Sequence, residues 1–423
     1  MPRLLIQGGT RLRGSVRIGG RKNSAVAVIP ATILCGGTSR LENIPQITDV
    51  EVYAEMLNDL GAGVCWVRRG QCAGLTVDAS NAAPVRVPYT SAKKLRASYY
   101  LLGALLGRFG EAEIPLPGGC DIGVRPIDQH IKGFEALGAE VMVEGGVVRV
   151  HATRLVGTTI YMDVVSVGAT VNTMLAAVLA EGLTTIENAA KEPHIVDLAN
   201  YLNACGARVQ GAGTDVIRIR GVSQAELHGA THAIIPDEIE AATFMIAACA
   251  TKGDVTVENV IPKHLAPVSA KLEETGCNVW ENGDAVRIWS NGTPPRAVHI
   301  TTLPYPGFPT DAQQPMTSLL SVANGTSMVT ETIWEGRFKH VQELNRMGTR
   351  IRVEGRTAII EGVAGLSAAP IQATDLRAAA ALVVAGLIAD GETEIAGIEH
   401  LDRGYDNVVG KLATLGARIS RRE

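Results

Sequence analysis

The loop around Cys120 holds the residue types best suited to chemistry. Its segment from Pro117 to Pro126 places one thiol among glycines, with the guanidinium of Arg125 five positions further on. A thiol reacts as its thiolate, and a nearby permanent positive charge favours that form. Glycines let such a loop adopt unusual backbone dihedrals and close over a ligand. Taken alone, the segment also fits a surface loop with an ordinary cysteine.

The elements that must position this loop form an internal repeat. A glycine-centred tripeptide recurs at intervals of roughly 70 residues, and its central glycines are Gly61, Gly138, Gly206, Gly276, Gly348 and Gly416. Each glycine is expected to end an amphipathic helix in the left-handed conformation. Before it lie a short strand and a helix that is apolar on all sides and therefore buried. We expect the buried helices near residues 24–35, 97–109, 171–180, 241–250, 316–323 and 376–389.

The six units predict an α/β fold with two domains. Each domain would wrap three buried helices in sheet. The alternating segment from Arg11 to Ile18 predicts a strand with no helix before it. The last unit lacks such a strand, so we expect residues 1–21 to join residues 230–423. Residues 22–229 would then form the other domain, with the active site in the cleft between the two.

Polar residues recur where the buried helices begin. Those residues are Lys22, Asn23, Arg96, Ser166, Val167, Gly168, Asp237, Asp311, Asp375 and Arg377. The loops after the short strands add Cys120, Arg125, Arg337 and Arg403. Helix N-termini carry free N–H groups and partial positive charge, so several that converge form an anion site. The pattern indicates a polyanionic small molecule bound between the domains. A lone Asp before a helix is more often only a cap.

Composition narrows the class of protein. A formal charge of −4 argues against general nucleic-acid binding, and no apolar run is long enough to span a membrane. Seven cysteines without a C-x-x-C pair indicate a reducing, cytoplasmic compartment rather than a disulfide framework. Cys35, Cys205 and Cys249 are expected to be small core residues. His228 and His232 have metal-ligand spacing without a third ligand nearby, so we expect neither metal nor cofactor.

Eight segments resemble the UDP-N-acetylglucosamine 1-carboxyvinyltransferase family over essentially the whole chain. They are residues 20–23, 95–98, 117–128, 166–170, 308–311, 331–338, 374–377 and 402–405. The resemblance implies transfer of the enolpyruvyl group of phosphoenolpyruvate to the 3-hydroxyl of UDP-N-acetylglucosamine by addition and elimination. Phosphate is released, in the first committed step of peptidoglycan precursor synthesis. The resemblance also implies that each domain is an inverse α/β barrel.

The resemblance also implies the roles of individual residues. Four cations would bind the phosphate and carboxylate of phosphoenolpyruvate: Lys22, Arg125, Arg377 and Arg403. Asp311 would take the 3-hydroxyl proton, and Cys120 would donate a proton or form an adduct, which also makes it the expected target of fosfomycin. The nucleotide sugar would contact Asn23, Arg96, Arg125, Pro126, Ile127, Asp128, Gln129, Ser166, Val167, Gly168 and Ile333, with Arg337 and Asp375 completing the site.

Three positions depart from the family pattern: Glu238 replaces a cation, His194 an acid, and Trp334 a smaller residue. They leave open an enolpyruvyl transferase that acts on a different nucleotide in an antibiotic pathway. A ring-shaped DNA clamp is also built of six α/β repeats, but its helices need basic faces, and one helix set here is almost uncharged. A ligand-sensing homologue without turnover is disfavoured by the presence of Asp311 and Cys120.

Overall fold

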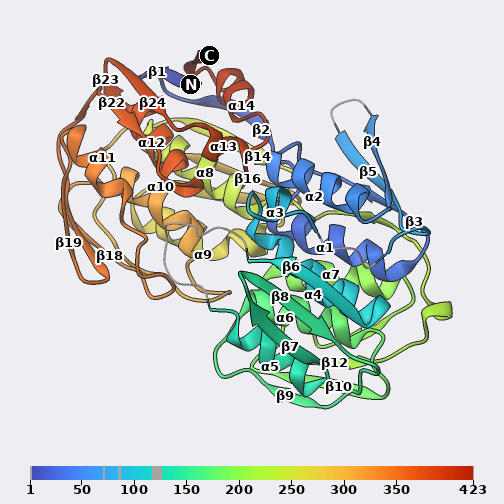
Figure 1. Ribbon diagram of the computed structural model, residues 1–423. Helices are drawn as coiled ribbons and strands as arrows, with labels where there is room; N and C mark the ends of the chain where they lie inside the picture. The colour runs from blue at the N-terminus through green and yellow to red at the C-terminus, as the bar shows by residue number, and fades with distance from the viewer. Residues whose placement is uncertain (1, 70–71, 84–86, 117–125, 423) are drawn as a thin grey trace. The chain divides into compact units, whose positions relative to one another are not determined.

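The structure is a computed structural model that describes residues 2–69, 72–83, 87–116 and 126–422. The described chain divides into two compact units. The central unit takes the described residues from Gly20 to Ile235. The terminal unit takes those up to Gly19 and those from Pro236 onward. Figure 1 labels the helices and strands of both units.

Three buried helices form the core of each unit. In the central unit they are α1 (Lys22–Cys35), α4 (Tyr100–Phe109), which follows the short helix η1 (Arg96–Tyr99), and α6 (Val167–Ala177). In the terminal unit they are α8 (Glu238–Ala250), α10 (Thr310–Leu320) and α12 (Leu376–Ile388). Every residue of α1 from Ser24 onward is buried, as is every residue of α8. Helices that are apolar on all sides need such complete enclosure.

Each core is enclosed by three sheets. In the central unit the first sheet contains, in order, β13 (Thr231–Ala233), β3 (Thr38–Glu42), β5 (Cys72–Asp78) and β4 (Gly63–Arg69). The second contains β6 (Glu111–Pro115), β8 (Val147–His151) and β7 (Glu140–Glu144). The third contains β11 (Arg208–Gln210), β12 (Val216–Arg220), β10 (Leu183–Glu187) and β9 (Thr159–Tyr161). Along the strands, buried and exposed side chains alternate, as in Leu183–Glu187.

The sheets of the terminal unit include both ends of the chain. One contains β22 (Pro370–Gln372), β24 (Glu392–Ala396), β1 (Arg3–Gln7) and β25 (Arg418–Arg422), and another β15 (Asn278–Asn282), β16 (Ala285–Trp289), β14 (Asp254–Glu258) and β2 (Arg13–Arg17). The third has β17 (His299–Thr301), β18 (Thr326–Thr330), β20 (Thr357–Glu361) and β19 (Arg350–Glu354), and β21 (Leu366–Ser367) pairs with β23 (Ala389–Asp390). β2 runs parallel to β14, with Val16 opposite Val257. Residues far apart in sequence therefore share one sheet.

The repeated glycines end outer helices as expected. These helices are α2 (Thr48–Asp59), α5 (Asp128–Ala136), α7 (Pro193–Ala204), α9 (Pro262–Glu274), α11 (His340–Arg346) and α14 (Val408–Thr414), and α3 (Tyr89–Ala92) and α13 (Glu399–Asp402) are shorter additions. All six tripeptide glycines have φ between 83° and 102°. This left-handed conformation favours glycine, so the prediction is confirmed.

Helix α10 begins earlier than its apolar pattern indicates. We expected it near residue 316, but it starts at Thr310. The first turns contain Gln313 and Gln314, which are polar yet fully buried. The amide of Gln314 donates a 3.0 Å hydrogen bond to the carbonyl of Arg337. Polar side chains with internal partners lie in this core, and a count of apolar residues misses them.

The expectation that the cysteines form no disulfides is wrong for one pair. Cys249 is buried at the end of α8, as expected of a small core residue, but it forms a disulfide with Cys277. The two are 28 residues apart and meet because α9 folds back on α8. Pairing of this kind depends on tertiary packing, so cysteine spacing does not reveal it. Cys35 and Cys205 are buried with free thiols, as expected.

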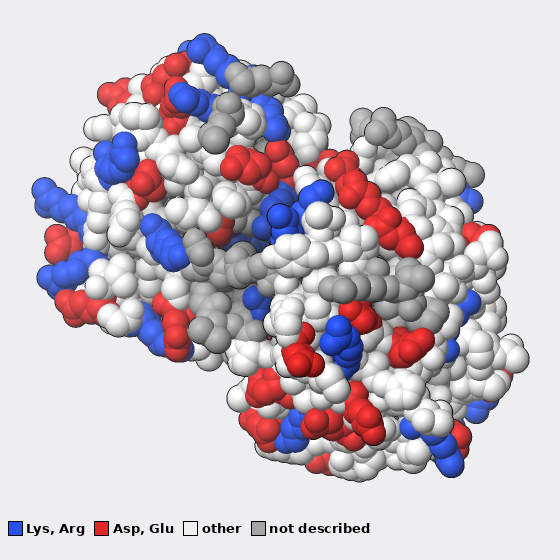
Figure 2. Space-filling view, in the orientation of Figure 1, with Lys and Arg blue, Asp and Glu red and all other residues white. Residues whose placement is uncertain are grey.

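The surface charge and the helix lengths can be compared with what a DNA clamp and a membrane-spanning protein require. Basic and acidic side chains are mixed over the face drawn in Figure 2, in contrast to the basic faces that a DNA clamp requires. Among the described residues, no helix is both long and apolar enough to cross a bilayer.

Candidate functional site

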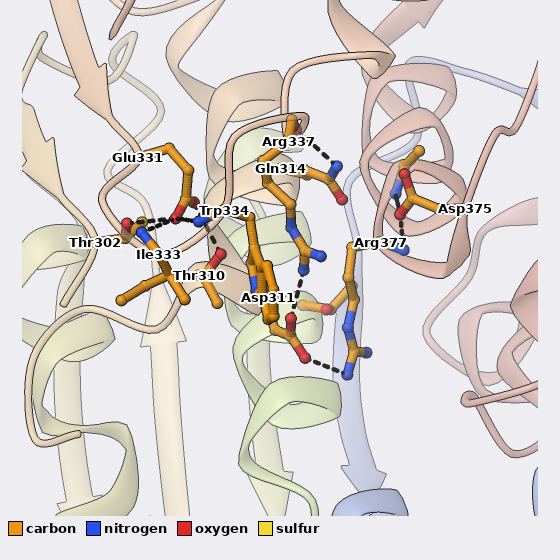
Figure 3. Close-up of polar contacts among 12 residues, drawn as sticks. Thr302, Thr310, Asp311, Gln314, Glu331, Ile333, Trp334, Arg337, Asp375 and Arg377 are labelled. Atoms are coloured by element: carbon orange, nitrogen blue, oxygen red, sulfur yellow. Dashed lines mark hydrogen bonds and ion pairs between the residues drawn. The ribbon is translucent and has the colours of Figure 1, made fainter. Parts of the chain in front are cut away.

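Asp311 lies between two buried arginines in the terminal unit. It occupies the first turn of α10, where one carboxylate oxygen pairs with Arg337 and the other accepts a 2.9 Å bond from Arg377 (Figure 3). The side chains of Arg337 and Arg377 are 4% and 5% exposed, and that of Asp311 is 25% exposed. Three residues from separate segments of the predicted site therefore meet, and the carboxylate is the most exposed of the three side chains.

The start of α12 fixes Arg377. Asp375 caps this helix, because its carboxylate accepts 2.9 and 3.0 Å bonds from the backbone N–H groups of Arg377 and Ala378. The guanidinium lies 5.6 Å from the ring centre of Tyr405, whose hydroxyl is 2.8 Å from that of Thr243. Burial by itself lowers the pKa of Arg377, but Asp311, Tyr405 and Asp237 outweigh it and raise that pKa. Arg377 is thus a permanent, pre-oriented cation.

A buried carboxylate, Glu331, organises the loop that carries Ile333. One of its oxygens accepts bonds from the Thr302 hydroxyl and the backbone N–H groups of Ile333 and Trp334, at 2.9, 2.8 and 3.1 Å. Its other oxygen accepts a 2.8 Å bond from the hydroxyl of Thr310. Figure 3 shows these bonds beside the Asp311 pair. Glu331 therefore ties the predicted nucleotide-sugar contact to the residue that precedes Asp311.

Arg403 lies at the end of α13, two residues before Tyr405. The ring of Tyr405 in turn lies against Arg377. The same short segment thus carries one predicted phosphoenolpyruvate cation and supports another.

Lys22 opens α1 in the central unit and pairs with Asp49. Its ammonium group is 2.7 Å from the Asp49 carboxylate, in a pair whose side chains are 13% and 4% exposed. One turn further along α2, the hydroxyl of Tyr53 donates to the carbonyl of Ala97. Burial and the charge of Asp49 raise the pKa of Tyr53, so this hydroxyl stays protonated as a donor. α2 thereby connects the segments that hold Lys22 and Arg96.

A second group of predicted residues in the central unit surrounds His130. Its ring is 2.8 Å from the amide of Asn172, and a methyl group in place of the Gly168 hydrogen would lie 2.8 Å from its Nε2. Burial, with the charge of Arg96, lowers the pKa of His130 to about 4, while Asp128 opposes the shift. The structure thus gathers Arg96, Asp128 and Gly168 around one neutral imidazole.

The remaining predicted contacts flank this group. Gln129 accepts a 2.9 Å bond from the backbone N–H of Asp163 and donates to the Asp163 and Asp128 carboxylates. Ser166 caps α6, of which Val167 is the first residue, by accepting from the N–H of Ala169 at 3.3 Å. Pro126 and Ile127 precede α5, with Pro126 exposed. Asn23 is the second residue of α1. Cys120 and Arg125 lie outside the described residues.

The departures from the family pattern fall at helix starts and in the Glu331 loop. Glu238 is buried in the first turn of α8, and His194 is buried in the first turn of α7. Trp334 is part of the loop that Glu331 holds. His232, one of the two discounted metal candidates, is 2.9 Å from Asp197. Among the described residues, no group of three or more His, Cys, Asp or Glu side chains fits a metal ion.

Sequence reasoning missed the residues that support the predicted ones. Asp49, His130, Glu331 and Tyr405 each hold or flank a predicted site residue. Several of their partners lie tens of residues away, such as Lys22 for Asp49 and Arg377 for Tyr405, so spacing carries no signal for those contacts. The one available signal is the position of Glu331 at the end of a short strand, where a carboxylate is well placed to bind loop N–H groups.

Comparisons with known proteins identify the class of enzyme to which the chain is similar. The model of the EPSP synthase (3-phosphoshikimate 1-carboxyvinyltransferase) family matches residues 6–412. The crystal structure of the enolpyruvyl transferase NikO from Streptomyces tendae is similar, with a TM-score of 0.89, 29% identity and coverage of 100% of this chain and 99% of that one. EPSP synthase of Acinetobacter baumannii has the same fold, with a TM-score of 0.76 and 19% identity over both full chains. Fold and family model together define a transferase of the enolpyruvyl class.

Sequence relatives narrow the class. A Clostridium botulinum protein named UDP-N-acetylglucosamine 1-carboxyvinyltransferase is 57% identical over 422 residues, which cover 100% of both chains. A protein of Symbiobacterium thermophilum, UDP-N-acetylglucosamine 1-carboxyvinyltransferase 3, is 56% identical over 99% of this chain and 98% of its own. The chain belongs to the UDP-N-acetylglucosamine 1-carboxyvinyltransferase family, which confirms the resemblance drawn from its motifs.

Proposed function

We propose that this protein transfers the enolpyruvyl group of phosphoenolpyruvate to the 3-hydroxyl of UDP-N-acetylglucosamine. The sugar oxygen adds to C2 of the enolpyruvyl group while C3 gains a proton. Loss of that C3 proton and of phosphate then restores the double bond. This reaction opens peptidoglycan precursor synthesis. The observation that carries the proposal is the partly exposed carboxylate of Asp311, held by Arg337 and Arg377 at positions that match the family motif.

Asp311 suits the role of the base for the sugar hydroxyl. Each carboxylate oxygen bonds one guanidinium in the pairs with Arg337 and Arg377, and a carboxylate is an acceptor that can take the proton of a substrate hydroxyl. Because its side chain is partly exposed, a substrate can reach it. The fixed donors around it need no reorganisation as charge develops in the transition state.

The anionic substrates are matched by cations of both units. Lys22 of the central unit and Arg377 and Arg403 of the terminal unit are assigned to the phosphate and carboxylate of phosphoenolpyruvate. A planar guanidinium binds either group through two parallel hydrogen bonds. Arg125 and Cys120 have the cation and proton-donor roles in the loop that lies outside the described residues. Catalysis is therefore expected to need residues of both units.

Phosphate release provides the test. Purified protein with phosphoenolpyruvate should release phosphate when UDP-N-acetylglucosamine is added and not when uridine or UMP is added. Turnover of the free nucleotides alone would instead identify an enzyme of the antibiotic-pathway type. Asp311→Asn should lower kcat by roughly 10²- to 10⁴-fold, because it removes a general base while keeping the shape. Asp390→Asn, a change at an exposed residue of β23, is the matched control and should leave kcat unaltered.

A further inference from the structure

The terminal unit has a hollow that the proposed reaction does not use. Its volume is about 650 Å³, and it lies on the sheet formed by β15, β16, β14 and β2. The wall comes from the start of β2, the turn between α8 and β14, and the end of β16. None of the residues assigned to the substrates lines it. Its size is that of a small-molecule pocket.

The lining of this hollow is basic in an acidic protein. Four cations line it, Arg11, Arg13, Lys252 and Arg287, against two carboxylates, Asp254 and Glu258. The lining therefore carries a net charge of +2 (four minus two), whereas the whole chain carries −4. Arg287 binds Asp254 through two bonds of 2.8 and 2.7 Å. With this pair neutralised, three cations face one remaining carboxylate, so the hollow favours an anion.

Lys252 reaches the hollow from an uncommon backbone conformation. Its φ is +52°, in the left-handed region that glycine adopts most easily. An internal repeat provides the comparison, because Gly36 stands at the matching position, two residues before β3, with φ of +63°. The following residue is glycine in both turns. A lysine thus stands where its backbone conformation favours glycine, and such outliers point to functional sites.

An aromatic wall completes the hollow. Trp289 lines it at the end of β16, and the guanidinium of Arg287 lies 5.0 Å from its ring centre. Hydroxyl groups of Ser15, Thr256 and Ser290 are also in the lining. A planar ring can stack on an indole, and hydroxyl groups can bond to phosphate oxygens.

We propose that this hollow binds a small phosphate-bearing molecule with a planar ring, of the nucleotide class. Arg11, Arg13 and Lys252 hold the phosphate groups, and Trp289 contacts the ring. A long nucleic acid fits less well, because the cations are confined to one hollow and Glu258 lies in the same wall. This inference does not depend on the proposed catalytic function.

Calorimetric titration with ATP and with inorganic tripolyphosphate, both without Mg²⁺, tests the proposal. ATP should bind, and Lys252→Gly should weaken it roughly tenfold, since one charged hydrogen-bond donor is lost. Glycine suits the backbone of this turn, so the melting temperature of this variant should stay equal or rise. Trp289→Ala should weaken ATP and leave tripolyphosphate unchanged. Arg17→Gln is the matched control, because Arg17 is exposed on the same strand but does not line the hollow.

Several results would overturn the proposal. Absence of ATP binding at millimolar concentration would remove the site. Full ATP binding by both Lys252→Gly and Arg11→Gln would place the nucleotide elsewhere on the protein. Tripolyphosphate binding as tight as that of ATP would exclude a ring-recognising site. Affinity that grows steadily with oligonucleotide length would indicate a nucleic-acid surface instead.

Discussion

Replacement of Glu331 by glutamine tests the link between the Ile333 loop and Asp311. The carboxylate is fully buried and accepts four hydrogen bonds, two from backbone N–H groups and two from threonine hydroxyls. A glutamine oxygen can still accept from Ile333 and Trp334. Its amide then faces Thr310, whose hydroxyl can turn and accept instead of donating. The change therefore removes the charge while keeping most of the pairing.

The magnitude follows from these four bonds. Hydrogen bonds to charged groups contribute about 1.5–3 kcal/mol and neutral ones about 1 kcal/mol, so Glu331→Gln should cost about 2 kcal/mol of unfolding free energy. Glu331→Ala leaves the loop N–H groups without this partner and should cost about 4 kcal/mol. Because small displacements of positioning groups are expensive, KM for UDP-N-acetylglucosamine should rise about tenfold in Glu331→Gln. KM for phosphoenolpyruvate should change less.

Urea unfolding and steady-state phosphate release measure both effects. Glu335→Gln is the control, because Glu335 lies in the same loop with its side chain 77% exposed, where its pair with Arg356 contributes little. If Glu331→Gln matches Glu335→Gln in stability and in both KM values, the reasoning about the buried network is refuted. A loss of stability with unchanged KM would refute the positioning role alone.

Three further predictions concern a disulfide, two histidines and the loop thiol. Cys249→Ser should lower the free energy of unfolding by about 3 to 4 kcal/mol through the freed 28-residue loop, and equal stability of oxidised and reduced protein in urea would contradict this. Burial, with nearby arginine charge, lowers the pKa of His130 and of His340 to about 4, so only the unfolded chain takes up these protons between pH 6.5 and 4. Stability should therefore fall on acidification through that window, by at most about 3 kcal/mol per histidine, and His130→Gln should reduce the slope of urea-derived stability against pH. Cys120→Ser should abolish covalent labelling by fosfomycin in mass spectra, and persistent labelling would identify another thiol.

Much of the fold could be predicted from the chain, because each repeat carries its own local signals. The six tripeptide glycines adopt positive φ where their helices end, as Gly138 does after α5. The apolar composition of α1 and α8 requires burial on every side. The predicted start of α10 lies too far along the chain, because buried glutamines with internal partners do not look like core residues in a sequence.

The residues of the site could be predicted from the sequence, but the ion pairs between them could not. Asp311, Arg337 and Arg377 stood out by type and by position in the repeat. Their mutual ion pairs join residues 26 and 66 positions apart, and only the packing of α10 against α12 brings Asp311 to Arg377. The same holds for Lys22 with Asp49 and for Cys249 with Cys277.

The sequence by itself thus determined the repeat, its helix ends and the residue types offered at the helix starts. These depend on backbone conformation and on hydrophobic periodicity, which act over a few neighbouring residues. Tertiary structure alone decided which charge meets which, that Glu331 accepts from Thr302 and Thr310, and that Arg11, Lys252 and Trp289 share one hollow. Such contacts join segments that are distant along the chain, and their energy exists only after the sheets have closed around the helices.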